Sequence, residues 1–70
     1  MKIEWTTAVA LRRVELWIDD FYVAHIQQIP DMSWVIFLWT TSDSRWVPQE
    51  VSCDNLETAK VVAVALVVMR

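Results

Sequence analysis

Polar clusters divide most of this chain into apolar runs of similar length. The clusters lie at residues 19–20, 30–33 and 42–45, and they consist mainly of Asp, Ser and Pro, which form turns where glycine is absent. The runs between them are rich in β-branched and aromatic residues, which favour strands. The pattern predicts strands over residues 14–18, 21–29, 34–41 and 46–51. Because the turns are short, we expect consecutive strands to pair as antiparallel hairpins.

Pro48 and the N-terminal segment define the two ends of the predicted sheet. Pro48 places the last strand at a sheet edge, since proline cannot donate a hydrogen bond to a neighbouring strand. The predicted meander has three to four strands. Residues 2–6 are compatible with one more, which would make five.

A helix is predicted for residues 55–69. Asp54 or Asn55 can cap its start, Glu57 suits the positive end of the helix dipole, and Arg70 suits the negative end. A strand is the alternative, because Val supplies five of the eleven residues from Lys60 to Arg70. The cap and the alanines favour the helix. The predicted fold class is therefore α+β, an antiparallel meander packed by one C-terminal helix.

Strand alternation assigns the side chains of the sheet to two faces, and both are apolar. The first face is mainly aliphatic and includes Val14, Leu16, Ile18, Phe21, Val23, His25, Ile29, Trp34, Ile36, Leu38, Val47 and Val51. The second is mainly aromatic and includes Glu15, Trp17, Tyr22, Ala24, Ile26, Val35, Phe37, Trp39, Trp46 and Glu50.

The predicted helix likewise has two apolar stripes. Its first stripe consists of Leu56, Ala59, Ala63, Leu66 and Val67. Its second stripe, on roughly the opposite side, consists of Val61, Val64, Ala65 and Val68. We expect the first stripe to pack on the aliphatic sheet face, where the two alanines permit close approach. At ~25 cal/mol per Å² of apolar area, exposing the other surfaces costs several kcal/mol, so self-association is expected.

Composition limits the function classes. Seventy residues make a single domain over residues 1–70, and the hydrophobic fraction of 56% is high for a globular domain. The net charge of −3 disfavours nucleic acid as a partner, and the lack of glycine argues against phosphate-cradling loops. The lone Cys53 fits a reducing, cytoplasmic location, and the nine-residue apolar run at residues 61–69 is too short to span a membrane.

The candidate catalytic groups have simpler structural explanations. His25 lies between apolar strand residues, and Cys53 is expected to be a small hydrophobic residue before the helix cap. Asp19 and Asp20 are turn formers. We therefore predict no catalytic, cofactor-binding or metal-binding residue.

The five tryptophans point instead to binding, because aromatic residues are enriched at interfaces. Trp5 and Trp34 are expected to be structural. The predicted partner or dimer interface consists of Trp17, Tyr22, Phe37, Trp39, Trp46, Val61, Val64 and Val68. This predicts a non-enzymatic protein–protein interaction module that forms a homodimer. The alternative is a nucleic-acid-binding β-sheet domain, whose aromatic rings would stack on bases.

Two stretches carry a resemblance. The run "VELWIDDFYVAHI", followed by a strand that begins with Trp and by "NLETAKVVAVAL", resembles small phage or prophage accessory proteins. In those proteins a β-meander precedes a helix that opens with a Leu-Glu-x-Ala-Lys phrase, matched here by Leu56, Glu57, Ala59 and Lys60. The resemblance implies a phage-encoded inhibitor or regulator of a host protein, acting in the host cytoplasm. The chain departs from that pattern in having no glycine at its hairpin turn and in carrying valines where charged helix residues are expected.

Overall fold

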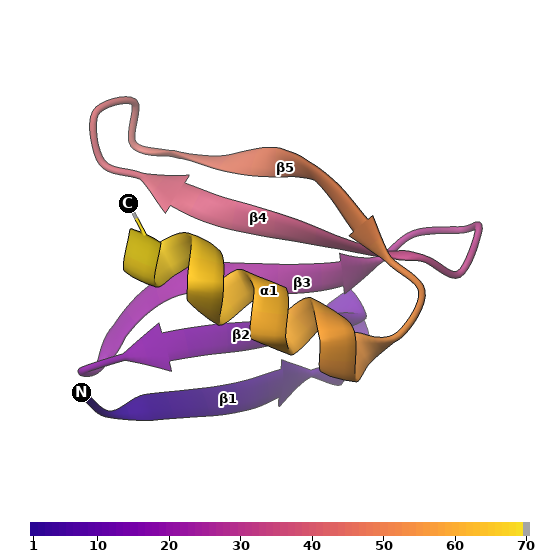
Figure 1. The fold of residues 1–70 in the computed structure, drawn as a ribbon, viewed down its shortest axis with the longest axis horizontal. Coiled ribbons are helices and arrows are strands. Elements are labelled where there is room, and N and C mark those ends of the chain that lie inside the picture. Colours follow the sequence, from indigo (N-terminus) through magenta and orange to yellow (C-terminus); the bar gives the residue numbers. More distant parts are fainter. Residues whose placement is uncertain (70) are drawn as a thin grey trace.

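Five antiparallel strands in sequence order form one sheet, and a helix packs on one of its faces (Figure 1). The computed structural model describes residues 1–69. The strands are β1 (Ile3–Ala8), β2 (Arg13–Ile18), β3 (Phe21–Gln28), β4 (Trp34–Thr40) and β5 (Arg45–Cys53), and they precede α1 (Leu56–Met69). A short 3₁₀ turn, Val9–Leu11, joins β1 to β2. The α+β meander is confirmed, the N-terminal segment forms its fifth strand, and the helix replaces the strand alternative.

The hairpin turns use residues other than glycine in left-handed backbone conformations. Asp19 and Asp20 connect β2 to β3 with φ angles of 50° and 70°. A two-residue hairpin turn whose twist matches that of its strands requires positive φ at both central residues. The Asp19 side chain accepts a hydrogen bond of 2.9 Å from the backbone N–H of Lys2, and the Asp19 N–H donates to the Lys2 carbonyl at 2.9 Å. The turn is therefore tied to the start of the chain.

The start of α1 follows the capping prediction. Oδ1 of Asn55 accepts a hydrogen bond of 2.8 Å from the backbone N–H of Thr58, which makes Asn55 the N-cap. Glu57 lies in the first turn, where a carboxylate interacts favourably with the helix dipole. The predicted role of Arg70 falls outside the described residues.

The first stripe of α1 packs on the sheet as expected. Ala59 and Ala63 are fully buried, and α1 makes its main contacts with β3, β4 and β5. Two small side chains let the helix approach the aliphatic side chains of the sheet closely. We call this side of the sheet the helix face. Its buried residues are Val14, Leu16, Ala24, Ile26, Ile36, Leu38 and Cys53.

The face assignment of β3 was wrong, because the β2–β3 pair contains a bulge. Leu16 pairs with Ala24 and Trp17 pairs with Tyr22, which leaves Val23 as an extra residue. Ala24 and Ile26, predicted on the aromatic face, are fully buried on the helix face instead. His25, predicted among the aliphatic residues, lies on the opposite face. The bulge places an isoleucine rather than an imidazole in the aliphatic core, and burying a polar ring there would be costly.

Strand β5 forms one edge of the sheet, as Pro48 predicts. Pro48 pairs with Phe37 and Ser52 pairs with Val35, so the three residues 49–51 face only Ile36. This irregularity bends the edge, which reduces its capacity to pair with another strand.

Candidate interaction surface

The face of the sheet away from α1, here called the open face, carries six aromatic side chains in mutual contact. We call this group the ring cluster. It consists of Trp17, Tyr22, His25, Phe37, Trp39 and Trp46. Three hairpins bring these residues together, because Trp17 pairs with Tyr22, His25 with Phe37, and Trp39 with Trp46.

Trp46 lies at the centre of the ring cluster. Its ring centroid is 4.6 Å from that of Tyr22, 4.6 Å from that of His25 and 5.2 Å from that of Trp39. The contact with Trp39 is edge-to-face, one of the favourable arrangements for aromatic pairs. These contacts join β3, β4 and β5 across the open face.

Stacked pairs extend the ring cluster on both sides. Trp17 stacks on Tyr22 with centroids 5.2 Å apart, and His25 stacks on Phe37 at 4.9 Å. His25 is only 4% exposed, although no helix covers this face. The neighbouring rings therefore bury the imidazole, while they themselves remain half-buried.

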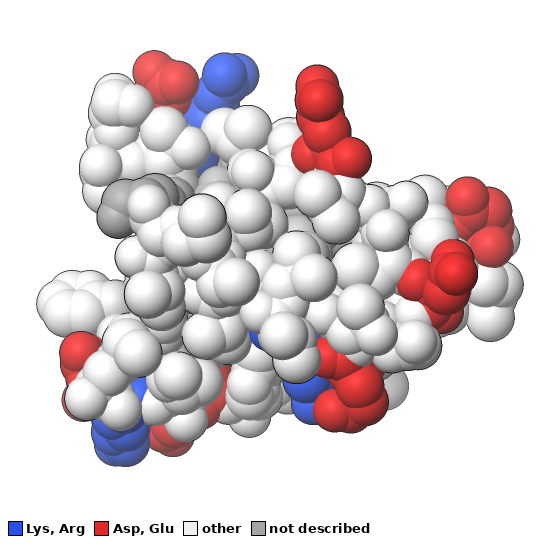
Figure 2. Space-filling model, viewed as in Figure 1, with Lys and Arg blue, Asp and Glu red and all other residues white. Residues whose placement is uncertain are grey.

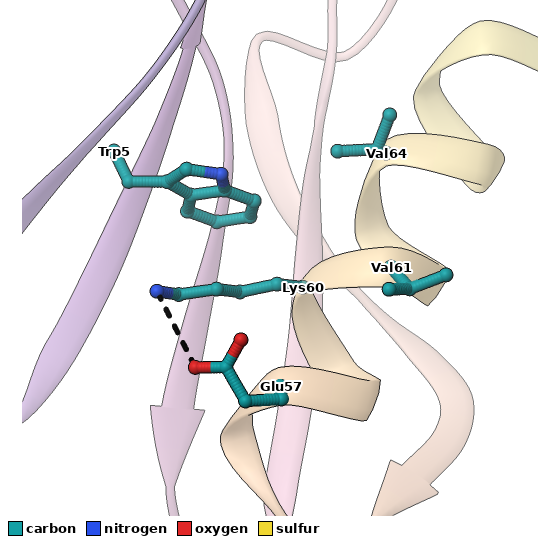
Figure 3. A pocket seen from close by; sticks show the side chains of 5 residues that line it. All are labelled: Trp5, Glu57, Lys60, Val61 and Val64. Atoms are coloured by element: carbon teal, nitrogen blue, oxygen red, sulfur yellow. Dashed lines mark ion pairs between the residues drawn. The ribbon is translucent and has the colours of Figure 1, made fainter.

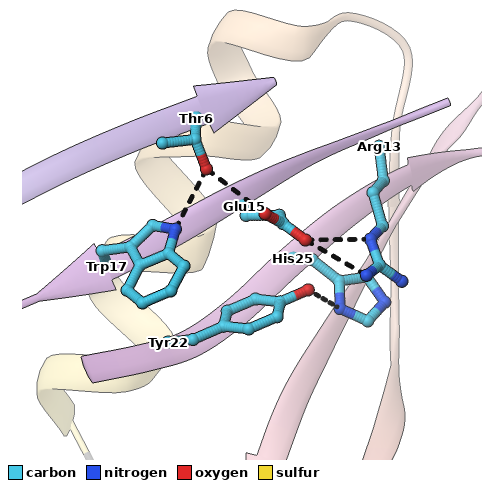
Figure 4. Close-up of polar contacts among 6 residues, drawn as sticks. All are labelled: Thr6, Arg13, Glu15, Trp17, Tyr22 and His25. Atoms are coloured by element: carbon cyan, nitrogen blue, oxygen red, sulfur yellow. Dashed lines mark hydrogen bonds and ion pairs between the residues drawn. The ribbon is translucent and has the colours of Figure 1, made fainter. Parts of the chain in front are cut away.

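A chain of polar contacts borders the ring cluster on β1 and β2 (Figure 4). Nε1 of Trp17 donates to Oγ1 of Thr6 at 3.0 Å, and Oγ1 of Thr6 donates to Oε1 of Glu15 at 3.3 Å. Nε and Nη2 of Arg13 contact Oε2 of Glu15 at 3.2 and 3.1 Å. The guanidinium carbon of Arg13 also lies 6.0 Å from the centroid of the Tyr22 ring. These contacts fix the side chains at this border before any partner binds.

Burial shifts the pKa values of two cluster residues. Burial, assisted by the positive charge of Arg13, lowers the pKa of His25 to about 4. Burial, assisted by the Glu15 carboxylate, raises the pKa of Tyr22 to about 12. Both groups are therefore neutral near pH 7, where a hydrogen bond of 3.0 Å joins Oη of Tyr22 and Nδ1 of His25.

The interface residues predicted from the sequence fall on two separate surfaces. The five aromatic residues of the predicted interface all belong to the ring cluster on the open face. Its three valines lie on α1, on the other side of the sheet. Val61 and Val68 are 71% and 56% exposed, whereas Val64 is half-buried and packs against the core. Trp5 and Trp34 pack against the buried core, as expected.

Sequence reasoning missed His25 as a cluster member and Arg13 and Glu15 as its polar border. The alternation of β2 already placed Glu15 beside Trp17. The sequence also held a signal that His25 belongs to the open face. If the alternation of β3 is shifted by one residue, Ala24 and Ile26 fall on the helix face, which is then aliphatic, and His25 falls on the opposite face.

The two candidate reactive groups of the sequence, His25 and Cys53, lie on opposite faces of the sheet. His25 belongs to the open face, whereas Cys53 is buried on the helix face, so the two cannot act together. Across residues 1–69, no three His, Cys, Asp or Glu side chains come together in a group that would hold a metal ion. No helix in that range is long and apolar enough to cross a membrane.

Comparisons with protein-family models, curated proteins and solved structures found no match to this chain.

Proposed function

We propose that this chain is a non-enzymatic protein–protein interaction module that forms a homodimer and presents its open face to a partner protein. The observation that carries the proposal is the ring cluster on the face that α1 leaves uncovered. Trp, Tyr and Arg are the residue types most enriched in interface hot spots. Trp17, Trp39 and Trp46 supply the indoles of this surface, with Tyr22 and Arg13 beside them.

The rigidity of the ring cluster supports binding. Each ring packs against at least one other, and the indole N–H of Trp17 is held by Thr6. Side chains that are ordered before association lose less conformational entropy when the partner arrives. The open face therefore resembles a preformed hot spot more than a loose apolar patch.

Three observations favour a protein over nucleic acid as the partner. Arg13, the cation above the Tyr22 ring, is already paired with Glu15 and is not free for phosphate. The net charge of −3 adds repulsion toward a polyanion. The flat sides of several rings also stack on one another, which leaves fewer of them for bases.

The resemblance to phage accessory proteins gives the proposal a setting. In that setting the partner is a host protein, the encounter takes place in the host cytoplasm, and binding inhibits or regulates the partner. The free thiol of Cys53 suits such a reducing compartment.

Site-specific crosslinking tests the proposal. A photoreactive phenylalanine analogue replaces Phe37 in the ring cluster and, as a control, Phe21, which is 72% exposed and makes none of the cluster's ring contacts. In bacterial cells, position 37 is expected to capture a defined protein that position 21 does not. That protein is then purified, and its affinity for the unmodified chain is measured by calorimetry.

Alanine variants complete the test. Trp39→Ala is expected to weaken binding by about 30-fold, which corresponds to a hot-spot loss of ~2 kcal/mol. Phe21→Ala is the matched control and should leave the affinity within about twofold. The circular dichroism spectrum of Trp39→Ala should remain that of a folded chain. Unchanged affinity in Trp39→Ala would contradict the proposal, and global unfolding would reassign Trp39 to the core.

A further inference from the structure

The outer side of α1 is apolar from Val61 to Met69, and it lies on the side of the molecule opposite the ring cluster. Figure 2 shows this side, where the centre of the view is free of charged side chains and the acidic and basic groups lie around its periphery. Val61, Val68 and Met69 are 71%, 56% and 82% exposed there. An apolar centre with a polar rim is the usual anatomy of a protein interface.

A pocket of about 490 Å³ adjoins this surface between α1 and β1 (Figure 3). Trp5 from β1 forms one wall, and the opposite wall comes from α1. Nζ of Lys60 lies 5.5 Å from the centroid of the Trp5 ring and 4.0 Å from the Glu57 carboxylate. Val61 and Val64 line the pocket and also belong to the second stripe of α1. The pocket and the stripe are therefore one continuous surface.

We propose that this surface is the homodimer interface and that the two α1 helices pack antiparallel across a two-fold axis between Val64 and Ala65. In this register Val61 of one copy faces Val68 of the second copy. The inference rests on the proposed homodimer and specifies its geometry.

The spacing of the stripe supports a second copy as the occupant. Residues 61, 64, 65 and 68 are symmetric about their midpoint, so a two-fold axis there matches the stripe to itself.

Charge agrees with the antiparallel arrangement. A parallel pair would bring the two Glu57 carboxylates and the two helix N-termini together, whereas the antiparallel pair separates them.

Sedimentation equilibrium of a charge-paired set of variants tests this geometry. The unmodified chain is expected to be a dimer, and Val61→Lys and Val68→Glu are each expected to be monomeric, because each homodimer would contain two charge–valine mismatches. Mixing the two variants should restore a dimer, since the antiparallel pair then contains one Lys–Glu contact and one Val–Val contact. In a parallel pair the same mixture retains two mismatches and stays monomeric.

Controls separate the possible failures. Val9→Lys alters a residue that is 80% exposed in the 3₁₀ turn, outside α1 and its second stripe, and should leave the dimer intact. Single variants that remain dimeric, or a mixture that stays monomeric while the unmodified chain is dimeric, would overturn the helix geometry but not the homodimer. A monomeric unmodified chain would overturn both the helix geometry and the homodimer. Partner binding is a separate test: its loss in Trp39→Ala, with the dimer intact, concerns the open face alone.

Discussion

At the scale of single residues, His25 is the clearest case of environment determining chemistry. It lies on the open face, yet the surrounding rings leave only 4% of it exposed. Burial and the nearby charge of Arg13 lower its pKa to about 4, so the imidazole is neutral at pH 7. The imidazole is therefore a neutral, buried member of the ring cluster.

This pKa predicts a loss of stability in mild acid. Because the folded pKa lies below the ordinary value of 6.5, the unfolded chain takes up a proton between pH 6.5 and pH 4 that the folded chain does not. The His25 contribution to the free energy of unfolding should therefore fall by ~3 kcal/mol as the pH drops from 7 to 4. Urea unfolding at several pH values, followed by tryptophan fluorescence, measures this change.

His25→Gln is the control for that titration. The amide can still accept a hydrogen bond from Tyr22 but carries no titratable group in this range. The variant should show a much shallower pH dependence between pH 7 and pH 4. An unchanged pH dependence would mean that other groups destabilise the folded chain in acid.

At the scale of elements, the turns show how a chain without glycine forms tight hairpins. Arg12, Asp19, Asp20, Met32 and Ser44 all have positive φ angles. Residues with a side chain are less stable in that region than glycine, although aspartate tolerates it better than most. The hairpins therefore form at some cost in local stability.

Asp20→Gly should stabilise the β2–β3 hairpin. Asp20 has a φ of 70°, and its ion pair with Lys2, at 3.6 Å, is exposed and contributes little. We expect the free energy of unfolding to rise by about 0.5–1 kcal/mol, as judged by urea unfolding. Asp20→Ala removes the same carboxylate without gaining backbone freedom, so it should not stabilise. Equal effects of the two substitutions would contradict this explanation.

The sequence predicted those features that depend on local chemistry. The turn at residues 19–20, the Asn55 cap and the edge position of Pro48 each follow from the conformational limits of one or two residues. The bulge at Val23 does not, because it depends on which side chains of β3 face α1. That choice moved His25 into the ring cluster, so five of the six cluster residues were predicted and His25 was not.

At the scale of the whole molecule, the two apolar surfaces have different properties. The open face is stabilised by contacts among its own rings, whereas the outer side of α1 exposes Val61, Val68 and Met69 to solvent. The helix surface therefore has more to gain from a second copy, and the open face remains accessible to a different partner in the proposed dimer.

Association of this kind makes thermal stability depend on protein concentration. For a chain that is folded as a dimer, each tenfold increase in concentration should raise the Tm by about 5 °C. Circular dichroism melts over a hundredfold concentration range measure the change. Val61→Lys, which removes the proposed contact, should melt at a temperature independent of concentration. A constant Tm for the unmodified chain would be evidence for a monomer.

The meander also has a consequence for synthesis on the ribosome. Every strand pairs only with its neighbours in the sequence, so the hairpins can close one after another as the chain emerges. α1 emerges after all five strands, so the aliphatic side of the nascent sheet stays in water until translation has passed residue 69. During that interval Leu16, Ile26 and Ile36 are open to neighbouring nascent chains, and aggregation is most probable then.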